Sequence, residues 1–231
     1  MTHYIIGISV LSNSDTGAKG KKSAGAEATR ILSLLEGQFE ESDIAKEALG
    51  RPFFPNRAVD FNIAHSGALL AISFARGKNL RVGCDVERMR SRAGAAEIAK
   101  RFFCPPETNY IFPRGAFNEA RFYEIWTLKE CFLKLRGLSV FDMASSPSFI
   151  SDEDPCAAQF AFGAIASSAA TFRLYELLDG TGERYMLASA IEGAVETQPE
   201  IRWFSQVPFD CRMIAEIKAA PNPAETVSPK R

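Results

Sequence analysis

Apolar residues either alternate with polar ones or form short unbroken runs in the parts of the chain that we expect to be strands. Residues 59–87 hold three such stretches, separated by a Ser-Gly turn and by the polar turn "RGKN". The simplest interpretation of residues 59–87 is three adjacent antiparallel strands. Further strand-like runs lie at 4–10, 147–150, 157–165, 170–179 and 185–191.

Apolar residues recur every three or four positions in the parts that we expect to be helices. We expect helices in the segments 27–39, 95–107 and 118–137, and a short helix that Gly50 and Pro52 end in the segment 41–56. The apolar stripe of the last segment consists of Phe122, Ile125, Leu128, Phe132 and Leu135. We expect Gly37, Gly50 and Gly137, and the paired prolines at 105 and 106, to end helices. The polar stretch 12–27 predicts a loop, and the whole pattern indicates an α+β fold.

Composition places the chain among soluble globular proteins. Its 231 residues are 46% hydrophobic and include 18 Phe, enough for one large domain or two small halves that share a core. A net charge of -1 gives no basic field, so we expect no nucleic-acid or membrane partner, and any phosphate recognition must be local. The five scattered cysteines favour neither disulfides nor zinc. The apolar start is too short for a signal peptide, and we expect a cytoplasmic protein.

Two acidic residues interrupt the apolar run "VGCDVE". Side chains alternate along a strand, so Asp85 and Glu87 share one face about 7 Å apart, and Gly83 leaves open space beside them. Either this face looks into water, as at a charged sheet edge, or a cation lies between the carboxylates. Hard oxygen ligands without His or Cys neighbours suit Mg²⁺, with Mn²⁺ as the alternative.

Three further polar positions have two interpretations each. Glu130 and Lys134 lie four apart on a helix, as in an ordinary exposed pair, but Trp126 beside them argues against a purely solvated face. His65, one of two histidines, ends a strand and is either structural or a donor to an anion. Arg51 in "LGRPFF" is either a phosphate-binding fork or a surface residue.

The segments "GRPFFP", "FNIAHSG", "VGCDVE" and "FYEIWTLKECFLKLRG", in this order, resemble the signature of the 4′-phosphopantetheinyl transferases. The resemblance is to the larger, pseudo-dimeric type that activates polyketide and non-ribosomal peptide synthetases. It covers residues 50–140, and the rest of the chain agrees only in general layout. Ala64 departs from the pattern, because many members carry a serine before the motif histidine, which puts one hydroxyl contact to coenzyme A in doubt.

This resemblance implies two similar α+β halves related by a pseudo-twofold axis, with coenzyme A in the cleft between them. We accordingly expect an N-terminal half-domain at 1–78, a C-terminal half-domain with the metal site at 79–218, and a flexible tail at 219–231. A chain that supplies both halves of its cleft is expected to be a monomer. The residues implied to bind Mg²⁺ are Asp85, Glu87 and Glu130. The residues implied to contact coenzyme A are Arg51, His65, Ser66 and Lys134.

The reaction implied by the resemblance transfers 4′-phosphopantetheine from coenzyme A to a serine of an apo acyl or peptidyl carrier protein. The serine hydroxyl attacks the β-phosphate, and 3′,5′-ADP leaves. Glu130 either takes the serine proton or acts mainly as a metal ligand, and Lys134 with His65 stabilises or protonates the departing phosphate. Carriers of fatty-acid, polyketide and peptide synthesis all remain open as partners.

Two other functions use the same residues. One is a Mg²⁺-dependent phosphohydrolase of coenzyme A or a nucleotide, in which water replaces the carrier serine. The other is a non-catalytic relative that binds coenzyme A or a carrier protein. Loss of an acid would favour the second, but Asp85, Glu87 and Glu130 are all present.

Overall fold

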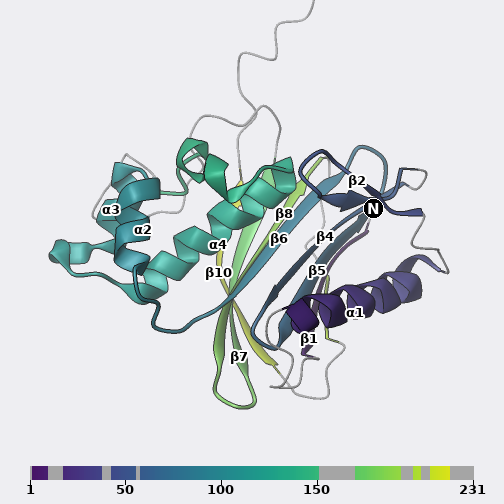
Figure 1. Cartoon of the computed structure of the whole chain (residues 1–231), viewed down its shortest axis with the longest axis horizontal. Helices are drawn as coiled ribbons and strands as arrows, with labels where there is room; N and C mark the ends of the chain where they lie inside the picture. Colours follow the sequence, from purple (N-terminus) through teal and green to yellow (C-terminus); the bar gives the residue numbers. More distant parts are fainter. Residues whose placement is uncertain are drawn as a thin grey trace, which may run out of the picture.

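The computed structural model describes residues 2–9, 18–37, 43–55, 58–150, 170–193, 200–203 and 209–218. They form a mixed α/β fold with two four-stranded sheets and one two-stranded hairpin (Figure 1). The expected combination of helices with small antiparallel sheets is therefore confirmed. Among the described helices, none has both the length and the apolar character needed to cross a bilayer.

The first sheet has the strand order β4-β5-β1-β9. Its strands are β1 (Thr2–Ser9), β4 (Val59–Ser66), β5 (Leu69–Arg76) and β9 (Glu200–Trp203). β5 runs antiparallel to both β4 and β1, whereas β9 runs parallel to β1. Helix α1 (Ala18–Glu36) covers one face, where Ile31 and Leu32 pack with Phe61 and Phe74. The other face of this sheet is turned toward β6.

The second sheet is antiparallel throughout, with the order β10-β7-β8-β6. Its strands are β6 (Arg81–Arg88), β7 (Ala170–Asp179), β8 (Arg184–Glu192) and β10 (Phe209–Lys218). Helix α4 (Glu119–Arg136) lies across its outer face (Figure 1), and Leu128 is buried there with Leu174 and Ala188. The smaller elements at this end are α2 (Ala95–Phe102), α3 (Pro105–Ile111) and the 3₁₀ turns η2 (Pro113–Gly115) and η3 (Val140–Ser145).

The two sheets pack against each other through their inner faces. Ala64 and Leu69 of the first sheet join Cys84, Val86 and Leu187 of the second in one buried cluster. Side chains at alternate positions of β6 therefore enter this core, and those between them face α4. Both faces of β6 are covered, which is how a strand with acidic residues can lie so deep in the molecule.

The helix predictions were right for the second half of the chain and partly wrong for the first. α2 and α4 are confirmed, and α4 ends at Gly137. The φ of Gly137 is 67°, a left-handed conformation that glycine adopts readily because it has no Cβ. Pro105 begins α3, because a proline is tolerated in the first helical turn. The loop expected at 12–27 is wrong from Ala18 onward, since α1 begins there. Alanine and lysine favour helix, and they outweigh the glycines of this stretch.

The short helix expected in the segment 41–56, up to Gly50, is also wrong. This segment forms the hairpin of β2 (Ala45–Lys46) and β3 (Pro52–Phe53). Gly50 has a φ of 89°, and its N–H donates to the carbonyl of Glu47, so the backbone turns back instead of coiling on. The proline at 52 also lacks the N–H that a continuing helix needs.

The β-hairpin at 59–76 is confirmed, with Gly67 (φ 59°) in its turn. The third strand exists as β6, but it pairs with β8 and not with β5, so the expected three adjacent strands are wrong. Strands adjacent in sequence usually pair. β6 instead joins the second sheet, where one of its faces packs on the first sheet and the other on α4. β7 and β8 are confirmed, and residues 147–150 contain only an isolated bridge at Ile150.

Four of the described strands were not predicted: β2 and β3, where a helix was expected, and β9 and β10. The run 157–165 and the tail 219–231 lie outside the described residues. The four described cysteines, Cys84, Cys104, Cys131 and Cys211, all have free thiols.

Candidate active site

Strand β6 and helix α4 bring the predicted acids and the lysine to one place. Trp126, Glu130 and Lys134 are spaced four apart, so they share one face of α4. The ammonium of Lys134 donates to Asp85 Oδ1 at 2.7 Å, and the indole N–H of Trp126 donates to Glu87 Oε1 at 3.2 Å. These two contacts align the acidic face of β6 with the polar face of α4, with Glu130 between them on the helix.

Gly83 allows this close approach. A Cβ at Gly83 would lie 2.6 Å from the carbonyl oxygen of Cys131 and 2.9 Å from Leu135 Cβ, both on α4. The open space expected beside Gly83 is therefore wrong, because the backbone of α4 occupies it. Any larger residue here would push the helix away from the strand.

Asp85 is a buried carboxylate with one unpartnered oxygen. Its side chain is 6% exposed, and Oδ2 has no hydrogen-bond partner among the described residues. Burial raises the pKa of Asp85 to about 7, against the lowering effect of Lys134 and with the help of repulsion from Glu87 and Glu130. Such an oxygen is costly to bury unless a ligand meets it.

Glu130 and Lys134 have shifted pKa values as well. Burial raises the pKa of the Glu130 carboxyl, while the charge of Lys134 opposes the shift. Burial disfavours the charged form of Lys134, but the neighbouring Asp85 outweighs it and raises the pKa of the ammonium. Glu130 is thereby a better proton acceptor than an ordinary glutamate, and Lys134 holds its proton firmly.

Glu87 is held by donors from two parts of the chain. Besides the indole of Trp126, the hydroxyl of Ser66 at the end of β4 donates to Glu87 Oε2 at 3.0 Å. The guanidinium of Arg92 lies over the indole of Trp126, with Cζ 5.3 Å from the ring centroid. The structure thus brings Ser66 into the site through Glu87.

The structure places His65 apart from the acids. It is exposed on β4, and side chains alternate along the strand, so it lies on the face opposite to Ser66. Ala64 is 4% exposed and packs among the apolar residues of the inner faces. The site therefore gathers Ser66, Asp85, Glu87, Glu130 and Lys134 around the β6–α4 contact, with His65 beyond its edge.

Arg51 is buried and faces protein groups. Its guanidinium donates to both carboxylate oxygens of Asp60, at 3.0 and 2.5 Å, and to the carbonyls of Val82 (2.8 Å) and Lys134 (3.2 Å). The arginine is 6% exposed. The predicted contact of Arg51 with coenzyme A stays a prediction.

One buried charged residue beside the site was not singled out in the sequence. Lys129, beside Glu130, is 1% exposed and pairs with the fully buried Glu107 of α3 at 3.0 Å. Lys129 also donates to Ser146 Oγ (2.8 Å) and to the carbonyl of Pro147 (3.2 Å). Lys129 lies four residues after Ile125 and three before Phe132, so it shares the apolar face of α4. This position was the sequence signal that the lysine is buried. The pair fastens α3 and the segment after η3 to the helix of the site.

A divalent ion would find suitable ligands here but no finished site. Within the described ranges, no three Asp, Glu, His or Cys side chains are gathered closely enough to form a ready-made metal centre. Asp85 Oδ1 is taken by Lys134, while Asp85 Oδ2 is free of partners among the described residues. Hard carboxylate oxygens, mutual repulsion and one orphan oxygen fit a hard divalent cation in donor type and charge.

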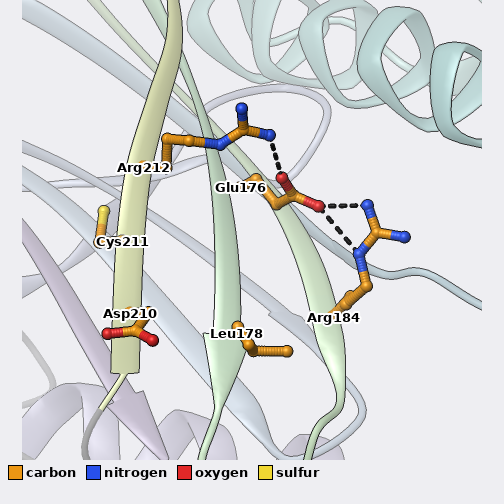
Figure 2. A pocket seen from close by; sticks show the side chains of 6 residues that line it. All are labelled: Glu176, Leu178, Arg184, Asp210, Cys211 and Arg212. Atoms are coloured by element: carbon orange, nitrogen blue, oxygen red, sulfur yellow. Dashed lines mark hydrogen bonds and ion pairs between the residues drawn. The ribbon is translucent and has the colours of Figure 1, made fainter.

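A separate pocket of about 360 Å³ lies elsewhere on the second sheet (Figure 2). It is lined by Glu176, Leu178, Arg184, Asp210, Cys211 and Arg212, from β7, β8 and β10. Figure 2 shows both arginines pointing at Glu176, and ion pairs join each of them to its carboxylate. Both arginines are thus paired with Glu176, and none of the predicted site residues lines this pocket.

Comparison with known proteins identifies the class to which the site segment is similar. The family model of the 4′-phosphopantetheinyl transferase superfamily matches residues 81–188, which include β6 and α4. The resemblance found in the sequence is therefore confirmed. Both acids of β6 and both charged residues of the α4 face lie inside the matched segment.

Individual relatives carry the same description. The chain is 32% identical over 112 residues to 4′-phosphopantetheinyl transferase Sfp of Bacillus subtilis (strain 168), covering 47% of this chain and 48% of the relative. It is 30% identical over 124 residues to 4′-phosphopantetheinyl transferase HetI of Nostoc sp. (strain PCC 7120), covering 50% of each chain. A phosphopantetheinyl transferase of Thraustochytrium sp. matches 76% of this chain at 24% identity, over 65% of its own length. The chain thus spans about half the length of the first two relatives.

Proposed function

We propose that this protein transfers the 4′-phosphopantetheine group of coenzyme A to a serine of an apo acyl or peptidyl carrier protein and releases 3′,5′-ADP. One observation carries the proposal: Asp85 and Glu87 of β6 face Glu130 and Lys134 of α4 within the segment that matches the transferase superfamily. Phosphoryl transfer depends on positioned charges more than on covalent chemistry, and this arrangement supplies both signs of charge in one place.

We also propose that the chain consists of two halves related by a pseudo-twofold axis, 1–78 and 79–218, with a tail at 219–231. The support is that each four-stranded sheet is covered by one long helix, α1 or α4. β9, from the second half of the chain, pairs in the first sheet, so the second half would contribute one strand to the sheet of the first.

Asp85, Glu87 and Glu130 would hold the divalent ion, Mg²⁺ or Mn²⁺. When bound, the ion neutralises charge on the pyrophosphate of coenzyme A. The support is the hard oxygen donor set and the unpartnered Oδ2 of Asp85. Trp126 and Ser66 orient Glu87 by donating to its two oxygens.

Lys134 would stabilise the phosphates as a fixed positive charge. Its raised pKa keeps the ammonium protonated, which supports electrostatic stabilisation over proton donation to the leaving group. His65, exposed at the end of β4 on the face opposite to Ser66, would contribute a contact to the phosphates of coenzyme A from beyond the edge of the site. This assignment makes 3′,5′-ADP leave as an anion that Lys134 and its neighbours hold.

Glu130 would accept the proton of the attacking carrier serine. Burial raises the pKa of its carboxyl, so it competes for that proton better than an exposed glutamate does. Its position on α4 between Trp126 and Lys134 puts it beside both the Glu87 and the Asp85 ends of the site. The partner would be a carrier protein of fatty-acid, polyketide or peptide synthesis, and the enzyme a cytoplasmic monomer.

The decisive experiment measures the intact mass of an apo carrier protein after incubation with this protein, coenzyme A and Mg²⁺. A gain of one phosphopantetheine on the carrier, abolished by EDTA, is the expected result. Unmodified carriers together with release of phosphopantetheine would indicate a phosphohydrolase. Unmodified carriers with bound but intact coenzyme A would indicate a non-catalytic relative.

A further inference from the structure

Strand β6, which carries Asp85 and Glu87, has one edge with no neighbouring strand among the described residues. β6 ends its sheet, bonded to β8 on one side only. Alternate residues of such a strand turn their N–H and C=O groups outward, and an exposed row of these groups invites pairing with other strands. On β6 the outward backbone groups include those of Val82, Cys84 and Arg88, each of which meets a side chain.

The side chains that cover this edge come from alternate positions of β4. Their oxygens accept from the outward backbone nitrogens of β6 at 2.8, 3.1 and 3.0 Å. In order along β4, these acceptors are Asp60, Asn62 and Ser66. The intervening position is Ala64, which packs against the apolar residues instead. Side chains of one strand thus replace the backbone of a missing neighbour strand.

At Val82, the first of these positions on β6, Arg51 adds a second hydrogen bond. Asp60 Oδ2 accepts from the N–H of Val82, and Arg51 Nη2 donates to the carbonyl of the same residue, both at 2.8 Å. The Arg51–Asp60 ion pair therefore bonds Val82 on both its donor and its acceptor, as a residue of an adjacent strand would.

The same guanidinium also reaches helix α4. Arg51 Nε donates to the carbonyl of Lys134 at 3.2 Å, in the last turn of the helix, where the N–H of Gly137 is the other donor to that carbonyl. Arg51 consequently bonds β4, β6 and α4 at once. The last two carry Asp85 and Lys134, the ion pair at the centre of the candidate site.

We propose that Arg51, together with Asp60, is a positioning residue that sets the register of β6 against α4 and so holds Asp85, Glu87 and Glu130 ready for a divalent ion. Four hydrogen bonds use four of the five donors of a guanidinium, and the two side chains are 4% and 11% exposed. A guanidinium so occupied acts on the substrate through the strand and the helix. The inference rests on the proposed function for the role of the acids.

Two variants test this role by binding measurements on the full chain. Arg51→Lys keeps the charge but replaces a planar fork of five donors with a compact ammonium of three, too few for the four hydrogen bonds that Arg51 makes. Asp60→Asn keeps the shape of the side chain and removes the carboxylate that pairs with Arg51. Mn²⁺ binding is followed by electron paramagnetic resonance, and coenzyme A binding by calorimetry in EDTA.

We expect both variants to bind Mn²⁺ about 10- to 100-fold more weakly, as for other groups that orient metal ligands, and to bind coenzyme A within about twofold of the wild type. Arg173→Lys is the matched control, since Arg173 is also 6% exposed and pairs with Glu216 at 2.8 Å, on strands that do not adjoin β6. The control should change neither binding constant. Melting curves identify any variant that does not fold.

A tenfold loss of coenzyme A affinity in Arg51→Lys, with Mn²⁺ binding intact, would make Arg51 a substrate contact and overturn the inference. Unchanged binding of both ligands would overturn it too. If Arg51→Lys does not fold, Asp60→Asn decides by the same Mn²⁺ criterion. Both measurements are made without transfer, so a wild type that binds Mn²⁺ but modifies no carrier would refute the proposed function and leave the positioning test intact.

Discussion

The ammonium nitrogen of Lys134 lies 2.7 Å from Oδ1 of Asp85, and this ion pair joins helix α4 to strand β6 at the centre of the candidate site. The lysine side chain is 30% exposed and the aspartate 6%, so the pair is open to ligands from the lysine side. A phosphate that entered here would compete with Asp85 for the ammonium of Lys134, and a cation would compete with Lys134 for the carboxylate of Asp85. The pair is therefore a contact that substrate binding is expected to rearrange.

Asp85→Asn should reduce transfer at least 100-fold, which corresponds to about 2.7 kcal/mol of transition-state stabilisation. The amide removes the negative charge while keeping the shape of the side chain. Carrier modification measured by mass spectrometry gives the rate. Mg²⁺ should raise the melting temperature of the wild type and not of the variant, because only the wild type binds the ion. If Mg²⁺ raised the melting temperature of both proteins equally, Asp85 would not be a ligand of the ion.

Trp126→Phe should weaken activation by Mg²⁺ about 10-fold, with smaller changes at saturating Mg²⁺. Phenylalanine keeps the ring contacts with Phe122, whose centroid lies 5.7 Å away, but loses the N–H that donates to Glu87. Initial rates over a range of Mg²⁺ concentrations separate the two effects. A fall in the saturated rate alone would show that the indole contributes to the chemistry in another way.

Gly83→Ala should destabilise the fold by about 1–3 kcal/mol, because the added Cβ meets backbone of α4 at 2.6 Å and the helix must move. The displacement should also separate Lys134 from Asp85 and lower activity. Urea denaturation measures the first effect and carrier modification the second. Gly94→Ala is a control for the loss of a glycine, since its Cβ would meet nothing within 4 Å, although its φ of 81° adds local strain.

Lys129→Met should cost about 3–5 kcal/mol of unfolding free energy, because it leaves the carboxylate of Glu107 buried without its cation. The double variant Lys129→Met/Glu107→Leu should recover part of this loss. Recovery stays partial because Glu107 also accepts from the backbone N–H groups of Cys104 (3.2 Å) and Phe149 (3.0 Å). A double-mutant cycle by chemical denaturation gives the coupling, and strict additivity would contradict the pairing.

Glu124→Gln should change how stability depends on pH. Burial raises the pKa of Glu124 in the folded protein above its ordinary value of 4.5, so the folded state binds this proton more tightly than the unfolded state does. The resulting stabilisation is fully present below pH 4.5 and is lost as the pH rises through the folded-state pKa. The wild type should therefore lose stability relative to Glu124→Gln over this range in urea titrations. A constant difference between the two would show that Glu124 does not titrate abnormally.

Local sequence patterns predicted the elements that carry the site. The apolar stripe of α4 and the alternation around Asp85 and Glu87 are periodic signals within single elements, and the structure confirms both elements. The facing of Lys134 and Asp85 depends on how α4 crosses β6. That crossing follows from Gly83, whose missing side chain the sequence analysis interpreted as open space and not as a helix contact.

Pairing between distant segments was beyond the same signals. β6 pairs with β8, about a hundred residues further along the chain, and nothing in "VGCDVE" distinguishes that partner from the adjacent β5. Arg51 illustrates a chemical ambiguity of the same kind. A guanidinium meets a phosphate or a carboxylate with the same fork of donors, and only the fold places Asp60 within its reach.

The parallel pairing of β9 with β1 affects the order in which the protein can assemble during synthesis. Tyr4 lies opposite Glu200, so the first sheet cannot complete this edge until residues 200–203 have left the ribosome. Until then β1 presents an open strand edge, which can pair with other chains. A chaperone that covers the open edge of β1 during synthesis should therefore raise the yield of folded protein. Helix α4 depends less on such protection, because its partners β6 and β8 leave the ribosome before β9.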